Sequence, residues 1–395
     1  MGRLRLSVEV VTLGCRLNLA ESERIRALFE PGENLVVVNS CAVTAEAVRH
    51  TRQAIRKARR ERPEARLLVT GCAVEIERSA LARMPEIDGF VENARKLDAR
   101  AWNVPLRAVS SPSSHTRAFI AVQNGCDHAC TFCVIPQGRG ASRSLTIPEA
   151  LREVERDLAH GAAEVVLTGV DVTSWGQDLP NSPSLGSLVL AILKAFPSLM
   201  RLRMSSLDGI EIDDELFDLF AGEPRIMPHL HLSLQHGHDL ILKRMRRRHL
   251  RADAVNLVER LKARRPEIAI GADLIAGFPT ETETMHRASL SIIEELDIVH
   301  GHVFPYSPRP RTPAARMPQV EKAAIKRRAA ELRGAVAQRR SRWLESLVGT
   351  PQAVLAEADG TGHAENFARV ALPDRTPRGA LVTVTPTALS EGLLR

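Results

Sequence analysis

The chain has 395 residues, which allows two or three domains with large buried cores and makes disulfide bonds unnecessary for stability. Aromatic residues make up only 4% of it, so the core must consist mainly of Leu, Val, Ile and Ala, as in helix-rich α/β proteins. The net charge of +7 is compatible with a polyanionic partner. No signal-peptide cleavage site and no run of about 18 apolar residues occur, so we expect a cytoplasmic protein with reduced thiols and no membrane contact.

The first hundred residues alternate between strand and helix patterns. In chain order, these strand-like and helical segments cover residues 6–15, 19–30, 33–41, 44–62 and 65–72. The alternation predicts a parallel sheet with crossover helices. The three strands end in Cys15, Cys41 and Cys72, which are 26 and 31 residues apart, about one βαβ unit each. The three thiols should therefore meet at the carboxyl edge of one sheet, where open α/β folds bind ligands.

A second group of three cysteines, Cys126, Cys130 and Cys133, lies within eight residues, so all six cysteines form two triplets. A single cysteine at a strand end is often an ordinary small hydrophobic residue, but three at equivalent positions favour metal ligation. Zinc bound by the second triplet and His128 is one alternative, although zinc motifs usually pair their ligands across a longer separation. A four-iron cluster fits better, because three thiolates leave one iron open for an exogenous ligand.

The C-x3-C-x2-C spacing, with Phe132 directly before the last cysteine, resembles the radical S-adenosylmethionine superfamily. In that superfamily the open iron binds the amino and carboxylate groups of the cofactor, whose cleavage gives a 5′-deoxyadenosyl radical. Other segments resemble the methylthiotransferase branch, and the resemblance covers residues 6–395. These segments include TLGCRLNLAESE, VVNSCAVTAEA, VTGCAVE, VLTGVDVTSWG, RLRMSSLD, HLSLQHGHDLILKRMRR and DLIAGFPTETE.

Within this branch, GCRLN and HVFPYSPRPRTPAA are most similar to enzymes acting on tRNA N6-threonylcarbamoyladenosine. Relatives acting on isopentenyladenosine or on a ribosomal-protein aspartate tend to carry other residues after the first cysteine. The resemblance therefore implies methylthiolation of C2 of threonylcarbamoyladenosine at position 37, next to the anticodon, and leaves those two substrates as alternatives. A different class of protein, an RNA-binding module with structural zinc, is a further alternative.

The resemblance also implies the cofactors and their ligands. A [4Fe-4S] cluster at Cys126, Cys130 and Cys133 would generate the radical from S-adenosylmethionine, with electrons from a flavodoxin or ferredoxin. A second [4Fe-4S] cluster at the N-terminal triplet would deliver sulfur, and a second S-adenosylmethionine would supply the methyl group. The residues implied for binding S-adenosylmethionine are Phe132, Gly169, Asp171, Ser205, Gln235 and Phe278. Thr280 departs from the pattern, because related enzymes usually carry glycine there.

From 117 to about 315, six apolar strand runs alternate with helical segments, which predicts a partial (β/α)6 barrel with its chemistry on the carboxyl-end loops. From 346 onward, short β-branched runs separated by turn residues resemble the small RNA-binding β-barrel called the TRAM module. This segment has four arginines, no lysine and five acidic residues, so it is not basic. The expected domains and linker are 1–105, a Ser- and Pro-rich linker at 106–116, 117–345 and 346–395.

Basic residues are concentrated on predicted helices. Segment 49–66 has eight Lys or Arg residues against two acidic ones, and Arg49, Arg52, Arg56 and Arg59 recur on one helical face. Segments 243–249 and 326–328 are similar. Each can be a solvated face, but together with the net charge they favour tRNA over a protein partner. The sequence leaves the oligomeric state open.

Overall fold

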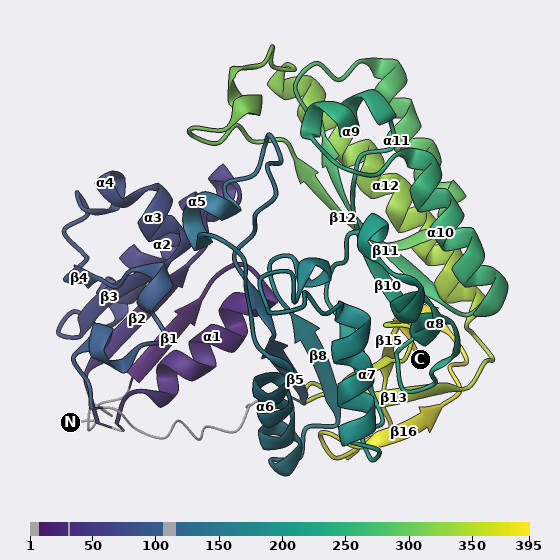
Figure 1. The fold of residues 1–395 in the computed structure, drawn as a ribbon, viewed down its shortest axis with the longest axis horizontal. Helices are drawn as coiled ribbons and strands as arrows, with labels where there is room; N and C mark the ends of the chain where they lie inside the picture. Colours follow the sequence, from purple (N-terminus) through teal and green to yellow (C-terminus); the bar gives the residue numbers. More distant parts are fainter. Residues whose placement is uncertain (1–7, 31, 106–115) are drawn as a thin grey trace.

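The computed structural model describes residues 8–30, 32–105 and 116–395. The predicted linker at 106–116 lies outside these residues except for Thr116. The described chain forms an N-terminal α/β part, a larger central α/β part and a small C-terminal β part, as Figure 1 shows. No helix of the described residues is long and apolar enough to cross a membrane.

The N-terminal part contains a parallel sheet, as predicted. Its strands lie in the order β1 (Val8–Thr12), β2 (Leu35–Ser40), β3 (Arg66–Gly71) and β4 (Gly89–Phe90). The accompanying helices are α1 (Arg16–Ala27), α2 (Ala45–Glu61), α3 (Cys72–Ile76), α4 (Arg78–Leu81), η1 (Asn93–Arg95) and η2 (Ala99–Trp102). Thr12 is opposite Asn39, which is opposite Thr70, so the carboxyl ends of the first three strands are level. This register brings the three strand ends to one edge.

Local sequence explains these elements. All six residues of β2 are buried, as expected for a central parallel strand covered by helices on both faces. In α2, Val48, Thr51, Ile55 and Ala58 are buried at helical spacing. The helix begins after Thr44, whose side chain accepts a hydrogen bond from the Ala47 amide.

Six parallel strands build the central part. They are β5 (Arg117–Ala121), β8 (Glu164–Thr168), β9 (Leu202–Met204), β10 (His229–Gln235), β11 (Ala269–Ala276) and β12 (Ile298–Pro305). The first three and the last three each form a sheet, and a parallel bridge between Leu207 and Leu232 connects the two sheets. The six strands therefore follow one another in chain order, which confirms the predicted six βα repeats. Between β5 and β8, a hairpin of β6 (Gln123–Asn124) and β7 (Arg143–Ser144) encloses the second cysteine triplet.

Helices cover the outer side of these strands (Figure 1). These helices are α6 (Ile147–Ala159), α7 (Leu185–Ala195), α8 (Asp214–Gly222), α9 (Asp239–Met245), α10 (Arg251–Arg264), α11 (Glu283–Glu295) and α12 (Lys322–Ser346). Leu230, Leu232 and Leu234 of β10 belong to the core beneath the helices. Because side chains alternate along a strand, His229 and His231 lie on the opposite side of the sheet. We call that side the inner face.

The C-terminal part is an open six-stranded sheet. Its strands are β13 (Gln352–Ala356), β14 (Thr361–Ala364), β15 (Arg369–Ala371), β16 (Leu381–Val384), β17 (Leu389–Ser390) and β18 (Leu393–Leu394). Their order is β16-β13-β14-β15-β18-β17, and among the described residues no pairing joins β16 to β17, so the predicted closed barrel is not confirmed. Pro386 follows β16 and has no amide hydrogen to extend the ladder.

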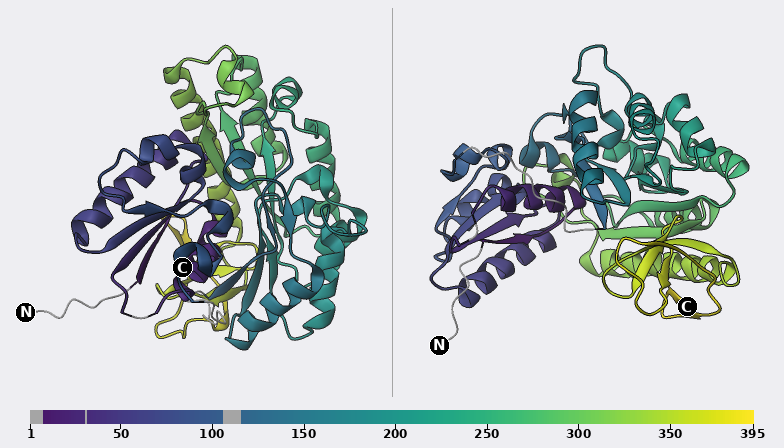
Figure 2. Two further views of the ribbon diagram at one scale, coloured as in Figure 1. Left: turned by 60° about the vertical axis from the view of Figure 1, so that its left-hand side comes forward. Right: turned by 90° about the horizontal axis from the view of Figure 1, so that it is seen from below.

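This C-terminal sheet is docked on the central part (Figure 2). The Arg201 guanidinium donates to the carbonyl oxygens of Ala353 at 2.6 Å and His363 at 3.2 Å. The Arg203 guanidinium donates to the Glu365 carbonyl at 3.1 Å. Both arginines lie on β9 or directly before it, so the module is held at the amino ends of the barrel strands.

Candidate iron–sulfur and cofactor site

The second cysteine triplet lies in the loop between β6 and the short helix α5 (Ile135–Arg139). The backbone amides of His128 and Ile135 donate to the sulfurs of Cys126 and Cys133, each at 3.4 Å. The Arg247 guanidinium donates to the Cys130 sulfur at 3.7 Å. Each sulfur of this triplet thus accepts from a donor that would stabilise a thiolate, as hydrogen bonds to cluster sulfurs do.

The spacing of the sulfurs distinguishes an iron–sulfur cluster from zinc. Thiolates on one tetrahedral zinc lie about 3.8 Å apart, given a zinc–sulfur distance of about 2.3 Å. Within the part of the chain that the structure describes, no group of three potential ligands lying within 4.8 Å of one another contains two cysteines. A four-iron cluster holds its cysteines on different iron atoms and needs this wider spacing. The residues present therefore fit a cluster better than a mononuclear zinc site.

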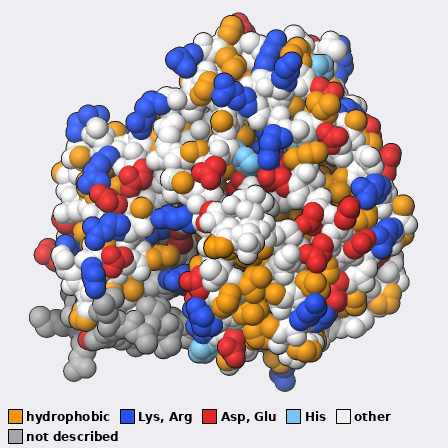
Figure 3. Space-filling view, in the orientation of Figure 1, with side chains coloured by type: hydrophobic (Ala, Val, Ile, Leu, Met, Phe, Trp, Pro, Cys, Tyr) orange, Lys and Arg blue, Asp and Glu red, His pale blue; other side chains and the backbone are white. Residues whose placement is uncertain are grey.

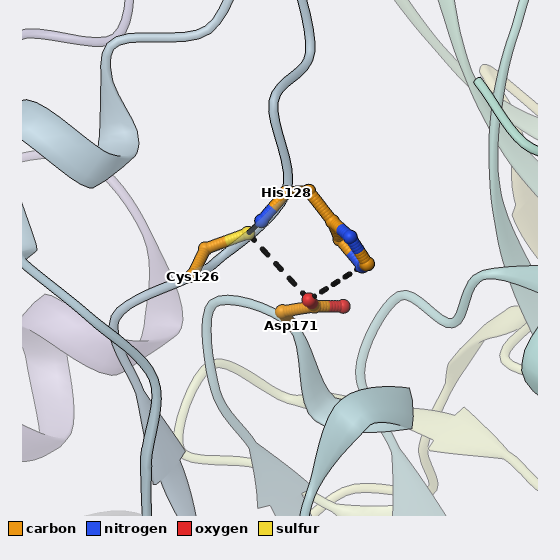
Figure 4. Close-up of side chains that lie close together, drawn as sticks. All are labelled: Cys126, His128 and Asp171. Atoms are coloured by element: carbon orange, nitrogen blue, oxygen red, sulfur yellow. Dashed lines mark hydrogen bonds and ion pairs between the residues drawn. The ribbon is translucent and has the colours of Figure 1, made fainter. Parts of the chain in front are cut away.

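Asp171 lies beside this loop, as Figure 4 shows. Its Oδ2 accepts a hydrogen bond from His128 Nε2 at 2.9 Å and lies 3.5 Å from the Cys126 sulfur. Hydrogen bonds to Asp171 and Glu211 raise the pKa of His128 to about 10, so the ring is a cation at neutral pH. His128 Nε2 is thus engaged with the Asp171 carboxylate in this structure.

Burial shifts the pKa of two thiols of this triplet, Cys126 and Cys133. It raises the pKa of Cys133 to about 12, and burial together with the Asp171 carboxylate raises the pKa of Cys126 well above its usual range. Without a metal, these thiols are protonated at neutral pH. Cluster binding must therefore release protons, as thiolate coordination generally does.

The N-terminal triplet lies at the carboxyl edge of its sheet, as predicted. Cys15 follows β1, Cys41 directly follows β2, and Cys72 begins α3 directly after β3. Gly14 has φ +94°, and a Cβ atom there would lie 2.8 Å from the Cys41 sulfur. The cysteines at the ends of β1 and β2 are therefore close neighbours. Among the described residues, no group of three ligand atoms within 4.8 Å of one another contains a cysteine of this triplet, so no compact mononuclear metal site is formed there.

Helix α5 connects the two triplets (Figure 1). It begins two residues after Cys133, and a Cβ atom on its Gly138 would lie 3.2 Å from the Cys72 Cβ. The Asn93 side-chain amide donates to the Gly138 carbonyl at 2.5 Å. Only four residues lie between Cys133 and Gly138, so the two sites are neighbours across the interface between the N-terminal and central parts.

A buried charge network extends this interface. The Arg139 guanidinium, at the end of α5, donates to Glu21 Oε1 at 3.0 Å and Oε2 at 3.1 Å, and to Asn124 Oδ1 at 2.8 Å. The Lys96 ammonium lies 2.6 Å from Glu21 Oε2. All three charged side chains are buried. The network reaches from α1 of the N-terminal part to Asn124, two residues before Cys126.

Comparisons with known proteins identify the family. Residues 120–291 match the radical SAM superfamily, and residues 7–92 match the uncharacterized protein family UPF0004. The chain is 42% identical to the threonylcarbamoyladenosine tRNA methylthiotransferase of Rickettsia prowazekii, covering 100% of this chain and 98% of that protein. The chain belongs to the radical S-adenosylmethionine methylthiotransferase family.

Two further likenesses add to this. The tRNA-2-methylthio-N(6)-dimethylallyladenosine synthase of Parafrankia sp. is 32% identical, over 98% of this chain and 85% of that protein. A radical S-adenosylmethionine methyltransferase from Kitasatospora setae, solved with cobalamin and a [4Fe-4S] cluster, has a TM-score of 0.56 at 17% identity. The structural match covers 79% of this chain and 77% of the methyltransferase. At this identity it supports the fold alone.

The residues implied for S-adenosylmethionine in this methylthiotransferase have different surroundings. Asp171 and Gly169 lie on the loop after β8, beside the cysteine loop. The Ser205 hydroxyl is buried and has no hydrogen-bond partner in the described part of the chain, so it is available to a ligand. Phe278 is fully buried and packs edge-on against Phe132, with ring centres 6.4 Å apart, as part of a small core. Gln235, with φ +70°, ends β10.

The inner face of the methylthiotransferase barrel carries polar residues that sequence reasoning did not single out. Asp273 Oδ1 lies 3.2 Å from both His231 Nε2 and His302 Nδ1. Below them, the Phe367 ring of the C-terminal sheet stacks on His229, with centres 5.1 Å apart. The alternation of side chains along β10 and β12 is the signal that could have predicted this inward row of histidines. The motifs of the family drew attention to the loops instead.

The basic segments of the methylthiotransferase are largely paired. Arg59 donates to three backbone carbonyls and to Asp88, so its role is structural. Arg52 lies 3.6 Å from Glu77, and Arg247 and Arg248 bind Asp208 and Glu211. Figure 3 shows Lys and Arg side chains scattered among acidic ones on the face it draws. The basic segments predicted from the sequence therefore do not form one continuous surface of unpaired positive charge on this face.

Proposed function

We propose that this enzyme transfers a methylthio group to C2 of N6-threonylcarbamoyladenosine at position 37 of tRNA. The observation that carries the proposal is the pair of cysteine triplets joined by α5 in a chain 42% identical, over its full length, to a threonylcarbamoyladenosine tRNA methylthiotransferase. A radical site and a sulfur site that share one interface suit a reaction that must use both on one carbon atom.

Each part of the chain has a distinct task in this proposal. When bound, the two [4Fe-4S] clusters and S-adenosylmethionine supply radical formation, sulfur and a methyl group, chemistry that acid–base groups cannot perform at an unactivated C–H bond. Cys126, Cys130 and Cys133 hold the first cluster, and Cys15, Cys41 and Cys72 hold the second. Arg139 and Glu21 fix the two sites relative to each other.

The contacts to S-adenosylmethionine belong to the same proposal. Ser205 offers its unpaired hydroxyl, and Asp171 lies beside the cysteine loop, where it accepts a hydrogen bond from His128. Phe132 and Phe278 pack against each other and support the loop from behind, and Gly169 and Gln235 provide backbone at the strand ends. The electron donor is a flavodoxin or ferredoxin, and the enzyme acts on tRNA in the cytoplasm.

Separating the two cysteine triplets tests the proposal. Cys130→Ala should abolish reductive cleavage of S-adenosylmethionine, because a radical site with two thiolates cannot hold its cluster. Cys41→Ala should keep 5′-deoxyadenosine formation but yield no methylthio product. The measurement is chromatography of 5′-deoxyadenosine and nucleoside mass spectrometry of threonylcarbamoyladenosine-containing tRNA, after iron and sulfide analysis of each variant.

Three outcomes would contradict the proposal. Undiminished 5′-deoxyadenosine from Cys130→Ala would remove the radical assignment. Stoichiometric zinc in colourless, anaerobically purified protein would favour the zinc alternative. Methylthiolation of isopentenyladenosine or of a ribosomal aspartate, with threonylcarbamoyladenosine left unchanged by the wild-type enzyme, would replace the substrate.

A further inference from the structure

Arg16 connects the N-terminal cysteine site to the inner face of the barrel. It directly follows Cys15 and is the first residue of α1. Its guanidinium carbon lies 5.8 Å from the ring centre of Phe119 on β5 and 5.5 Å from that of Phe367. The side chain therefore leaves the sulfur site and reaches between two aromatic rings on the inner face.

Among the described residues, no hydrogen-bond acceptor or carboxylate is paired with the Arg16 guanidinium. Its charged neighbours are Arg117, Arg203 and, with opposite charge, Glu164. Glu164 is already bound by Arg203 through two hydrogen bonds of 2.9 and 3.2 Å. The nearest acid is therefore engaged, and Arg16 adds a positive charge without a counter-ion.

Two more donors near Arg16 lack partners. The Nη1 atoms of Arg117 and Arg203 are buried and make no hydrogen bond to any of the residues that the structure describes. A buried donor without a partner costs about 1–3 kcal/mol, so such donors usually serve a ligand or water. Arg117 is paired with Glu357 at 3.0 Å and Arg203 with Glu164 at 2.9 Å, so Arg16 supplies the excess positive charge beside two unsatisfied buried nitrogens, a combination that favours an anion.

We propose that Arg16 binds the carboxylate of the threonylcarbamoyl group of the substrate nucleoside. This inference rests on the proposed function and names the residue that selects its substrate. A threonyl group on the adenine carries a carboxylate, whereas a dimethylallyl group carries no charge. The planar guanidinium matches a carboxylate with two parallel hydrogen bonds. Because Arg16 adjoins Cys15, a carboxylate held there places the adenine near the sulfur site.

An RNA phosphate is the other anion that Arg16 could meet. The guanidinium lies between the Phe119 and Phe367 rings, on the inner face of the barrel. A side group of one inserted nucleoside can reach this position more easily than a continuous sugar–phosphate backbone. The geometry therefore favours the carboxylate, and removing the substrate's charge distinguishes the two.

The test uses anticodon stem-loop RNAs carrying threonylcarbamoyladenosine or its neutral methyl ester. The wild-type enzyme should prefer the acid by about 30-fold or more in kcat/KM, the range for a buried charge pair. Arg16→Gln should lose this preference by losing activity on the acid, and Arg16→Lys should retain part of it. Arg26→Gln, an exposed arginine on the same helix, should behave like the wild type.

Three readouts separate substrate selection from damage to the enzyme. Iron content and 5′-deoxyadenosine formation without RNA should match the wild type in Arg16→Gln and Arg16→Lys. Fluorescence anisotropy with the two RNAs should show the acid preference in the dissociation constant of the wild type and its loss in Arg16→Gln.

The outcomes distinguish this inference from the proposed function. Absence of methylthio product from the acid RNA with the wild-type enzyme would contradict the proposed function itself. If the wild-type enzyme is active but accepts the acid and the ester equally, Arg16 does not select the substrate. An equal loss of activity on both RNAs in Arg16→Gln would also overturn the inference, because it would assign Arg16 to phosphate binding or to structure. If Arg16→Gln does not fold, an Arg16→Lys enzyme without acid preference would equally overturn it.

Discussion

At the scale of single residues, the buried network of Glu21, Lys96 and Arg139 sets the relation between the two cysteine sites. One carboxylate neutralises two cations there, in an interior that excludes water. The network keeps one positive charge in excess. This charge would stabilise the nearby cysteine thiolates, which are negatively charged when they hold a cluster. Breaking such a buried group by removing one partner leaves uncompensated charge, which is far more costly than losing a surface pair.

Glu21→Gln should therefore lower the free energy of unfolding by about 3–5 kcal/mol, because Lys96 and Arg139 remain buried without a counter-charge. Urea unfolding measures this. The control is Glu46→Gln on α2, whose exposed pair with Arg49 should contribute less than about 1 kcal/mol. Similar losses in the two variants would show that the network does not stabilise the interface.

Sequence reasoning at this scale found residues with a distinctive chemistry and missed those defined by contact. The six cysteines stand out by type and spacing, and their predicted convergence at the sheet edge is confirmed for the N-terminal triplet. The network could not be found, because Glu21, Lys96 and Arg139 are more than 40 residues apart and ordinary in type. The sequence left Arg59 either on a solvated face or in contact with phosphate, because helical periodicity shows a face but not what the face touches.

At the scale of elements, the turns before the cysteines depend on backbone that only glycine adopts readily. Gly71 has φ +92°, and a Cβ atom there would lie 2.4 Å from the Ser40 carbonyl oxygen. Gly71→Ala should cost about 2 kcal/mol or more, from the left-handed backbone and from displacement of β2. The displacement should also lower iron binding by the N-terminal triplet.

The matched control is Gly32→Ala, which shares a positive φ of +113° but has no atom within 4 Å of the added Cβ. It should cost about 1 kcal/mol and leave iron binding unchanged. Iron would be counted in a background with Cys126, Cys130 and Cys133 replaced by alanine, so that only the N-terminal site is measured. Equal iron in the two glycine variants would contradict the role of Gly71.

The elements themselves were largely predictable, because strands and helices in βα units have clear periodicity. Three of the four N-terminal strands, β1, β2 and β3, lie within their predicted runs, whereas the two-residue strand β4 was not predicted. The six barrel strands occur at the six predicted apolar runs, although β5 begins one residue earlier and β12 ends one residue later than its run. Helix α1 begins at Arg16, three residues before the predicted segment, and so places Arg16 at its first turn. Closure of the C-terminal sheet was not predictable in the same way, because it depends on pairing between β16 and the two-residue strand β17, which local patterns do not determine.

At the scale of the whole molecule, the three parts are docked on one another through charged and aromatic contacts. The N-terminal part meets the barrel at α5, and the C-terminal sheet meets it at the amino ends of the strands (Figure 2). The sequence predicted an RNA-binding module for the C-terminal segment. Its composition did not indicate that one side of the module packs against the barrel. The side of this sheet that faces the barrel is occupied by Arg201 and Arg203, which leaves only its other surfaces for the expected RNA contact.

Phe367 is the centre of that docking. Its ring, on a backbone with φ +70°, stacks on His229 and His363 and lies 4.9 Å from the guanidinium carbon of Arg203. Phe367→Ala should cost about 3 kcal/mol, because it removes the ring contacts and leaves a cavity between two parts of the chain. The loss should appear as faster amide hydrogen exchange in β13 to β16, while the N-terminal strands β1 to β3 keep their protection. Phe304→Ala, at an exposed position on β12, is the control and should change neither. Unchanged exchange in the C-terminal sheet of Phe367→Ala would show that Arg201 and Arg203 hold it without the ring.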